Sequence, residues 1–367
     1  MTDRRTFLRL AAGVAGIYGL HATGYFEHAH AQTIAPTEGR LRILVLGGTG
    51  FIGPHQIEYA LARGHRVTTF NRGNRRGMFG NRVEELIGDR DLNADDGLAA
   101  LAGDRTWDVV IDNSATLPLW VRRTTELLRE RCRRYLFVSS VASFELGDGG
   151  HFADDAPLAT FENPQTEEID WNLYGPMKAE CERIVHEVFG RGATIVRPVY
   201  IIGPGDRSDR FTYWVERLTH GGDVLGPALP EAAVQTVDVR DLTSWMVRLL
   251  ENDVAGDFNG GDAPWTRAGL LYGIRATTTA PCRFHFPSLE LANELEWYAP
   301  MLAWGENSMT FGVESARRTG LICRPLAESS LDTRRWWHAQ PDERRASPRG
   351  WPSSEFEREG LRRMGIG

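Results

Sequence analysis

Along residues 41–198, short continuous apolar runs alternate with segments in which apolar residues have helical spacing. Short apolar runs such as 41–46, LRILVL, are typical of strands that are buried on both faces of a sheet. Most runs are followed by a segment with helical spacing, and the first of these segments ends at Gly64. The pattern predicts strands at 41–46, 65–70, 83–88, 107–112, 133–140 and 193–198, and helices at 52–63, 92–102, 118–131 and 174–189.

This alternation predicts an α/β fold with a parallel sheet covered on both faces. After Pro198 the rhythm changes, and Gly, Pro and aromatic residues become more frequent. We therefore expect a Rossmann-type doubly wound parallel sheet over 40–200 and a smaller C-terminal substrate lobe over 201–338, interleaved with it. Residues 339–367 read as a polar C-terminal tail, in part disordered. Ligands of such sheets bind at the carboxyl ends of the strands.

The N-terminus has the features of an export signal. Arg4 and Arg5 precede an apolar stretch at 10–20 that is too short to span a bilayer. Ala29 and Ala31 supply small residues at the two positions that a signal peptidase reads. Residues 1–31 resemble a twin-arginine signal peptide, which predicts the twin-arginine export machinery as a partner and a periplasmic location. The alternative is a basic tail followed by a short helix.

Composition narrows the classes of partner. A net charge of −7 leaves no general basic field, so we expect no nucleic-acid partner. No other run is long and apolar enough for a stable membrane span. The four cysteines contain no C-x-x-C pair, so we predict no metal site, and the pairing of Cys282 with Cys323 is left open.

A glycine-rich loop, LGGTGFIG, follows the first strand and opens the first helix. Gly47 permits a tight turn, Gly50 lets backbone amides approach a pyrophosphate, and Gly53 lets the helix pack closely on the strand. The helix N-terminus adds amide donors and a partial positive charge. The loop, including Thr49, Phe51 and Ile52, therefore predicts a dinucleotide site, with a tight turn that binds nothing as the alternative.

Basic residues at the end of the second strand suggest the type of dinucleotide. Asn71 and Arg72 stand where a carboxylate would select NAD, and Arg75 and Arg76 follow. A planar guanidinium suits a 2′-phosphate, so we favour NADP, with NAD as the alternative. A solvated loop is the other interpretation of Arg75 and Arg76. Asp89, after the third strand, lies where it can meet the adenine.

The motif YGPMK places Tyr174 and Lys178 four residues apart, on one face of a helix. Pro176 is tolerated only in the first turn, which puts Tyr174 at the helix start. A nearby ammonium lowers the pKa of a phenol, and a phenol tuned in this way moves protons at a substrate hydroxyl. Ser140, at the end of the fifth strand, is the favoured residue to hold the substrate oxygen, although serines there often only cap a turn.

These motifs together resemble the short-chain dehydrogenase/reductase superfamily, specifically its extended and atypical NAD-dependent epimerase/dehydratase branch. The resemblance covers about residues 41–250. Its motifs are the three glycines, Gly88-Asp89, Asp112-Asn113-Ser114-Ala115, Ser140, Tyr174 and Lys178, Arg197-Pro198 and VDVRDL at 237–242.

The resemblance implies roles for these residues. Tyr174 is the acid/base, Lys178 lowers its pKa and binds the nicotinamide ribose, and Ser140 orients the substrate. Asn113, Ser114, Pro198 and Tyr200 border the cofactor. Two departures concern the substrate: the 112–115 segment replaces small apolar residues, and Phe144 stands where many relatives carry tyrosine.

A redox-neutral reaction would explain how an exported protein can use a nicotinamide cofactor. Twin-arginine export carries folded proteins, and the periplasm offers no ready pool of nicotinamide cofactor. A tightly bound NAD(P) that is regenerated in each cycle fits epimerisation or dehydration.

The branch and the tryptophans of the later chain suggest a carbohydrate substrate: a sugar, a glycoside or a related polyol. The alternative is a nucleotide-bound binding or RNA-processing protein, because some atypical relatives resemble chloroplast stem-loop RNA-binding proteins. A homodimer through two helices is one option by the same resemblance.

Overall fold

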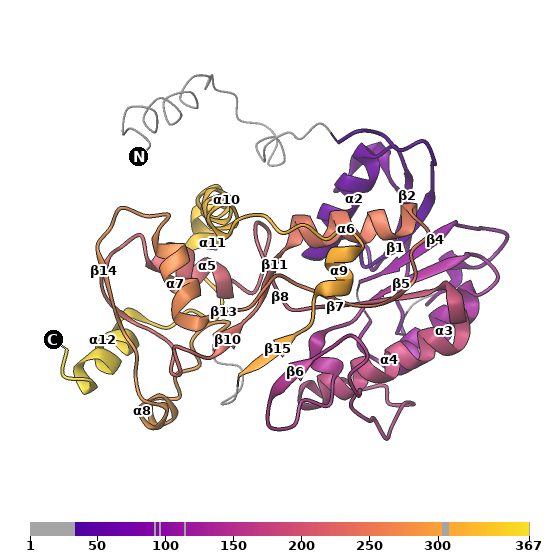
Figure 1. Cartoon of the computed structure of the whole chain (residues 1–367). Coiled ribbons are helices and arrows are strands. Elements are labelled where there is room, and N and C mark those ends of the chain that lie inside the picture. The colour runs from indigo at the N-terminus through magenta and orange to yellow at the C-terminus, as the bar shows by residue number, and fades with distance from the viewer. Residues whose placement is uncertain (1–33, 92, 95–96, 114, 303–307, 367) are drawn as a thin grey trace, which may run out of the picture. The chain divides into compact units, whose positions relative to one another are not determined.

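Seven parallel strands form the central sheet. They are β1 (Arg42–Leu46), β2 (Arg66–Asn71), β3 (Glu84–Ile87), β4 (Val109–Asp112), β5 (Arg134–Val138), β7 (Ala193–Pro198) and β12 (Gly256–Gly260). Their spatial order is β12-β7-β5-β4-β1-β2-β3 (Figure 1). The computed structural model describes residues 34–366 apart from 92, 95–96, 114 and 303–307. The predicted Rossmann-type parallel sheet is confirmed, and β12 adds a strand from beyond residue 200.

Helices cover both faces of this sheet. Alternate side chains of a strand point to opposite faces, so Ile43 and Val45 pack in one core and Leu44 and Leu46 in the other. The covering helices are α2 (Ile52–Ala62) and α6 (Val239–Glu251) on the first face, and α3 (Pro118–Leu128) and α4 (Tyr174–Phe189) on the second (Figure 1). The two faces explain the continuous apolar runs in the sequence.

The helix predicted at 92–102 is wrong. Within the described part of that segment, only a short 3-10 turn forms, at Ala99–Leu101. The preceding residues favour turns, since the amide of Asn93 donates to the Asp91 carboxylate at 3.0 Å and Gly97 has a φ of 55°. Local side-chain hydrogen bonds therefore replace the helix.

The rest of the chain builds a second lobe around its own core, which contains Phe211, Trp214 and Leu271. Its helices are α5 (Arg210–Arg217), α7 (Arg267–Arg275), α8 (Leu289–Glu294), α10 (Leu326–His338), α11 (Asp342–Ala346) and α12 (Ser354–Arg363). By contrast, α9 (Glu314–Arg318) contacts β12 and packs Ala316 in the core on the first face of the central sheet. Four small two-stranded sheets pair β6 (Gly150–Phe152) with β15 (Met309–Phe311), β8 (Tyr200–Ile202) with β11 (Thr236–Asp238), β9 (Gly222–Leu225) with β14 (Cys282–His285), and β10 (Ala233–Val234) with β13 (Trp265–Thr266).

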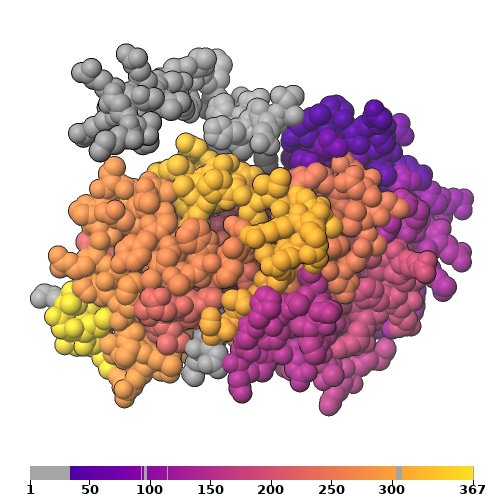
Figure 2. Space-filling view, viewed as in Figure 1, coloured from indigo at the N-terminus to yellow at the C-terminus, as the bar shows by residue number. Residues whose placement is uncertain are grey.

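The C-terminal residues are folded, contrary to the loose tail expected at 339–367. Trp351, Phe356 and Leu361 pack in the core of the second lobe. In Figure 2 the last residues, in yellow, lie against the orange surface of that lobe. The expectation failed because three apolar anchors are spread among many charged residues.

Asp209 anchors this C-terminal segment. Its side chain is fully buried and accepts hydrogen bonds from Arg344 at 2.5 and 2.7 Å and from the amide of Arg349 at 2.8 Å. The indole of Trp351 donates to the Asp209 carbonyl at 3.0 Å. One buried carboxylate therefore holds a segment that is more than a hundred residues away in sequence.

Three remaining expectations concern membranes, cysteines and export. Among the described residues, no helix has the length and apolarity that crossing a membrane requires. Cys282 and Cys323 are both free thiols, so the pairing left open is not formed. The predicted signal peptide, 1–31, lies outside the described residues.

We predict that Asp209→Asn lowers the free energy of unfolding by about 2 kcal/mol, because it leaves the Arg344 guanidinium without its buried counter-charge. Asparagine tolerates the left-handed backbone at this position, where φ is 57°, so the change tests the charge alone. Chemical denaturation measures the effect.

Asp342→Asn is the matched control. The Asp342 side chain is 94% exposed and pairs only with Arg345 on the same helix. Its loss should change stability by less than about 0.5 kcal/mol. Equal effects of the two substitutions would contradict the anchoring role of Asp209.

Candidate active site

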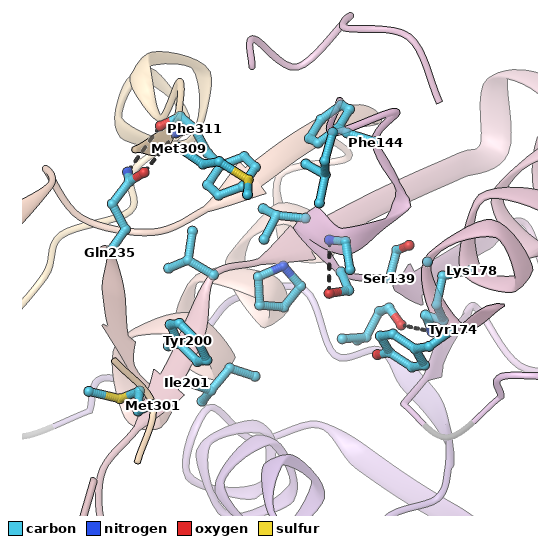
Figure 3. A pocket seen from close by; sticks show the side chains of 18 of the residues that line it. Ser139, Phe144, Tyr174, Lys178, Tyr200, Ile201, Gln235, Met301, Met309 and Phe311 are labelled. Atoms are coloured by element: carbon cyan, nitrogen blue, oxygen red, sulfur yellow. Dashed lines mark hydrogen bonds between the residues drawn. The ribbon is translucent and has the colours of Figure 1, made fainter. Parts of the chain in front are cut away.

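A cavity of about 960 Å³ opens at the carboxyl ends of the central strands. Its lining includes Ser140, Tyr174 and Lys178 near the strand ends, and Met309 and Phe311 of β15. Figure 3 shows the last four of these. The carboxyl edge of a parallel sheet is where strand-end loops leave room for a ligand. The structure thus brings all three predicted catalytic residues to one cavity.

Tyr174 is the first residue of α4 and lines the cavity together with Ser140, whose side chain lowers the pKa of the Tyr174 phenol. The Ser140 oxygen also accepts from the amide of Ala142 at 3.2 Å. Gly175 makes this arrangement possible, because a Cβ there would lie 2.1 Å from the Ala142 carbonyl oxygen. The close backbone approach brings the helix start onto the turn that carries Ser140.

Lys178 lies one turn further along α4 and is buried. Its ammonium donates to the carbonyls of Ala115 at 2.9 Å and Val138 at 2.6 Å, and it lies 4.1 Å from the centroid of the Phe137 ring. Burial lowers the pKa of Lys178. The lysine therefore ties the helix to the ends of two strands.

Burial dominates the electrostatics of Tyr174. It raises the pKa of Tyr174 above its usual value, and the Ser140 side chain and the charge of Arg210 offset this only in part. The Lys178 ammonium donates to backbone carbonyls in this structure. The lowering of the Tyr174 pKa by Lys178 stays a prediction.

The glycine-rich loop has the predicted geometry. Gly47 has a φ of 79°, which side chains rarely adopt. A Cβ on Gly53 would lie 2.4 Å from the Gly48 carbonyl oxygen, so only glycine allows α2 to begin so close to β1. At Gly50 the nearest atom to a Cβ would be 3.8 Å away, which leaves the loop open on that side.

Cavity residues fit a dinucleotide. Phe51 and Ile52, at the start of α2, line the cavity together with Asn113, Pro198 and Tyr200. The Asn113 amide donates to Gln56 at 2.6 Å, while its Oδ1 is buried and has no hydrogen-bond partner among the described residues. Such an acceptor suits a ribose hydroxyl. Ser114 lies outside the described residues.

The residues predicted to choose between NAD and NADP lie outside this cavity. Arg72 is exposed at the end of β2, where the Asn71 side chain accepts from the amide of Gly73 at 2.9 Å. Asp89 accepts from the amide of Asp91 at 3.1 Å. They follow neighbouring strands, β2 and β3, beside the glycine-rich loop of β1.

Sequence reasoning missed Arg207, which reaches the glycine-rich loop from the second lobe. Its guanidinium donates to the carbonyl of Thr49 at 2.6 Å. Burial and the charges of Arg75 and Arg349 lower the pKa of Arg207. The motif GPGDR gave no indication of this contact, because the distance in sequence exceeds 150 residues.

Other unusual residues have structural roles. Asp112, noted as a departure, is buried and pairs with Arg90 at 2.7 Å and with the Tyr135 hydroxyl at 2.5 Å. Trp214 and Trp297 are buried in the second lobe and donate to backbone carbonyls. By contrast, Trp171 is 70% exposed, lines the cavity and stacks on Tyr174 with ring centroids 6.1 Å apart.

Comparison with known proteins agrees with this geometry. The model of the NAD dependent epimerase/dehydratase family matches residues 43–261, which is more than half of the chain. The chain belongs to this family. The matched region contains the glycine-rich loop, Ser140, Tyr174 and Lys178.

The similar proteins include a chloroplast stem-loop binding protein and solved structures described as an epimerase and an enzyme. The chloroplast stem-loop binding protein of 41 kDa b from Arabidopsis thaliana is 26% identical over 231 residues, or 58% of this chain. The chain matches only 56% of the length of that relative. A putative epimerase from Burkholderia cenocepacia is 19% identical, with a TM-score of 0.63 over 84% of this chain and 99% of that one. The Bordetella bronchiseptica enzyme WbmG, solved with NAD, is 15% identical, with a TM-score of 0.61 over 85% and 97%.

We predict that two alanine substitutions in the glycine-rich loop affect different properties, one the stability of the fold and the other the binding of the cofactor. Gly53→Ala should lower the free energy of unfolding by about 1–3 kcal/mol, because its Cβ meets backbone atoms that must shift. Gly50→Ala should leave stability within about 0.5 kcal/mol but weaken NAD(P) binding by about tenfold or more, because the methyl group blocks the approach of a pyrophosphate. Denaturation and calorimetric titration separate the two effects, and equal binding by wild type and Gly50→Ala would contradict the assignment of the loop.

We predict that Ser140→Ala raises the pKa of Tyr174 further, because the lost hydrogen bond favours the phenolate. Difference absorbance of the tyrosinate, referenced to Tyr174→Phe, measures this titration. Ser139→Ala is the matched control, since the Ser139 hydroxyl donates to Glu182 instead. The same shift in both variants would remove Ser140 from this role.

Proposed function

We propose that this protein is an NAD(P)-dependent epimerase or dehydratase that transiently oxidises a secondary alcohol and keeps its cofactor. The position of Tyr174, Ser140 and Lys178 in one cavity, which the start of α2 also lines, is the observation that carries this proposal. A nicotinamide dinucleotide supplies a reversible hydride acceptor when bound. The pyrophosphate would lie at the amides of 47–53, and Asn113, Lys178, Pro198 and Tyr200 would hold the nicotinamide half.

Tyr174 then has the role of acid and base. Its phenol oxygen takes the proton of the substrate alcohol and returns it at the end of the cycle. Ser140 holds the same substrate oxygen through its hydroxyl. Burial raises the pKa of Tyr174 in this structure, and positive charge beside the phenol would lower it. A bound nicotinamide ring in its oxidised form would supply such a charge.

The choice of cofactor and its retention belong to the same proposal. Arg72 and Arg75 support NADP, with NAD as the alternative, and the presence of NAD in the similar WbmG structure supports a nicotinamide dinucleotide in general. Arg4 and Arg5 support export to the periplasm, where retention of the cofactor is an advantage. The substrate is expected among sugars, glycosides and related polyols.

A second candidate is a nucleotide-bound binding protein without turnover. The similarity to the chloroplast stem-loop binding protein favours it. The net charge of −7 opposes RNA binding, since it offers no general attraction to phosphates. Retention of Tyr174, Ser140 and Lys178 in one cavity favours the enzyme.

We predict that Tyr174→Phe reduces turnover by about 10²–10⁴-fold while cofactor binding is unchanged, because only the hydroxyl is lost. The measurement is a rate assay on candidate secondary alcohols, with cofactor affinity determined in parallel. Tyr213→Phe is the control, since Tyr213 is buried in α5 and does not line the cavity. Turnover within a few-fold of wild type would exclude Tyr174 as acid/base.

We predict that replacement of Arg4 and Arg5 by lysine keeps the protein in the cytoplasm, whereas the wild type reaches the periplasm with bound NAD(P). Cofactor bound to the native state stabilises it for a route that carries folded proteins. Cell fractionation followed by mass spectrometry of the released nucleotide tests both parts and distinguishes NADP from NAD. Processed periplasmic protein without nucleotide would favour the binding-protein candidate.

A further inference from the structure

One wall of the cavity is apolar and rigid. The parallel pairing of β15 with β6 places Phe311 against Phe152 and Phe144, with the three ring centroids 5.7–6.1 Å apart. All three rings are buried. Since each ring is held by the other two, this wall is formed before any substrate arrives.

The neighbouring lining residues extend the same surface. Met309 precedes Phe311 on β15 (Figure 3), and Val234 lines the cavity from β10, which contacts β15. Gln235 is the polar side chain labelled on this side. Its amide nitrogen donates to the carbonyls of Asp262 at 2.8 Å and Phe311 at 3.0 Å, so both of its N–H groups are used within the protein. Its oxygen accepts from the amide of Phe311 at 2.7 Å.

Polar groups gather elsewhere in the cavity. Ser139, Ser140 and Tyr174 lie at the reacting end. Two charged lining residues lie near Tyr200: the guanidinium of Arg210 is 5.4 Å from the Tyr200 ring centroid, and the charges of Arg210 and Arg267 lower the pKa of Tyr200 against the larger effect of burial. The cavity therefore has a polar end and an apolar wall.

We infer that the substrate is a secondary alcohol with a sparsely hydroxylated, apolar body, which packs against the wall formed by Phe144, Phe311, Met309 and Val234. A fully hydroxylated ring would press hydroxyls against carbon and sulfur, where they lose water and gain no partner. Each such hydroxyl typically lowers affinity by about tenfold or more. A deoxygenated ring, an alkyl-substituted ring or a glycoside with an apolar aglycone avoids this loss. The inference rests on the proposed function, because it takes Tyr174 to mark the reacting alcohol.

Menthol and myo-inositol form a suitable pair of probes, since both are six-membered carbocyclic alcohols that differ in alkyl and hydroxyl content. Full-length protein loaded with NAD(P) is titrated with each at equal concentration. Binding is measured as a rise in unfolding temperature, and hydride transfer is measured by nicotinamide fluorescence. We expect menthol to bind at least tenfold more tightly. Equal or tighter binding of myo-inositol, or binding of neither probe, would overturn the inference.

Variants test whether the wall causes the preference. Met309→Gln should reduce the ratio of menthol to myo-inositol affinity by about tenfold, and the isosteric Val234→Thr should reduce it in the same direction if Met309→Gln fails to fold. Met78→Gln is the matched control, because Met78 is 40% exposed and outside the cavity. An unchanged ratio in both wall variants would overturn the inference.

The experiment separates this inference from the proposed function. Menthol binding without hydride transfer to either cofactor supports the apolar wall and contradicts the redox assignment. Hydride transfer from myo-inositol in preference to menthol supports the redox assignment and contradicts the apolar wall.

Discussion

The site depends on the two hydrogen bonds of the buried Lys178 ammonium. They join α4 to the carbonyl of Ala115, just after β4, and to that of Val138, the last residue of β5. A buried ammonium without partners is costly, so the helix is fixed in the register that satisfies it. Tyr174, one turn earlier, and Ser140, two residues after Val138, are thereby held within hydrogen-bond reach of one another.

Two glycines complete this constraint by allowing helices to begin in contact with backbone. Gly53 lets α2 start against Gly48, and Gly175 lets α4 start against Ala142. In each case a side chain would collide with a carbonyl oxygen. The cofactor loop and the acid/base Tyr174 are therefore built in the same way. In each, a strand ends in a short turn, and a glycine in the first turn of the next helix lets that helix contact the backbone of the turn more closely than a residue with a side chain would.

Much of the sheet and the reacting end could be predicted, because both depend on local spacing. Continuous apolar runs located six of the strands of the central sheet, and YGPMK located the start of α4. The helix expected at 92–102 does not form, since Asp91 and Asn93 form a turn that helical spacing does not reveal. The pKa of Tyr174 could not be predicted from spacing either, because it depends on how deeply the phenol is buried.

The apolar wall could not be predicted for a different reason. Phe144 and Phe311 are separated by more than 150 residues, and the parallel pairing of β6 and β15 that joins them involves strands too short to show a period. The same limit applies to Arg207 and Thr49. Contacts between distant segments thus build the apolar wall and support the glycine-rich loop from outside, whereas local patterns define the loop itself and the start of α4.

The Asp209 anchor couples a distant part of the surface to the nucleotide loop. Arg344, Arg349 and Trp351 hold the anchor. The segment just before the anchor contributes Arg207 to the glycine-rich loop and Asp206 to the cavity. A substitution at one of the three anchoring residues therefore reaches the cofactor loop through the segment around residues 206–209, although none of the three lines the cavity.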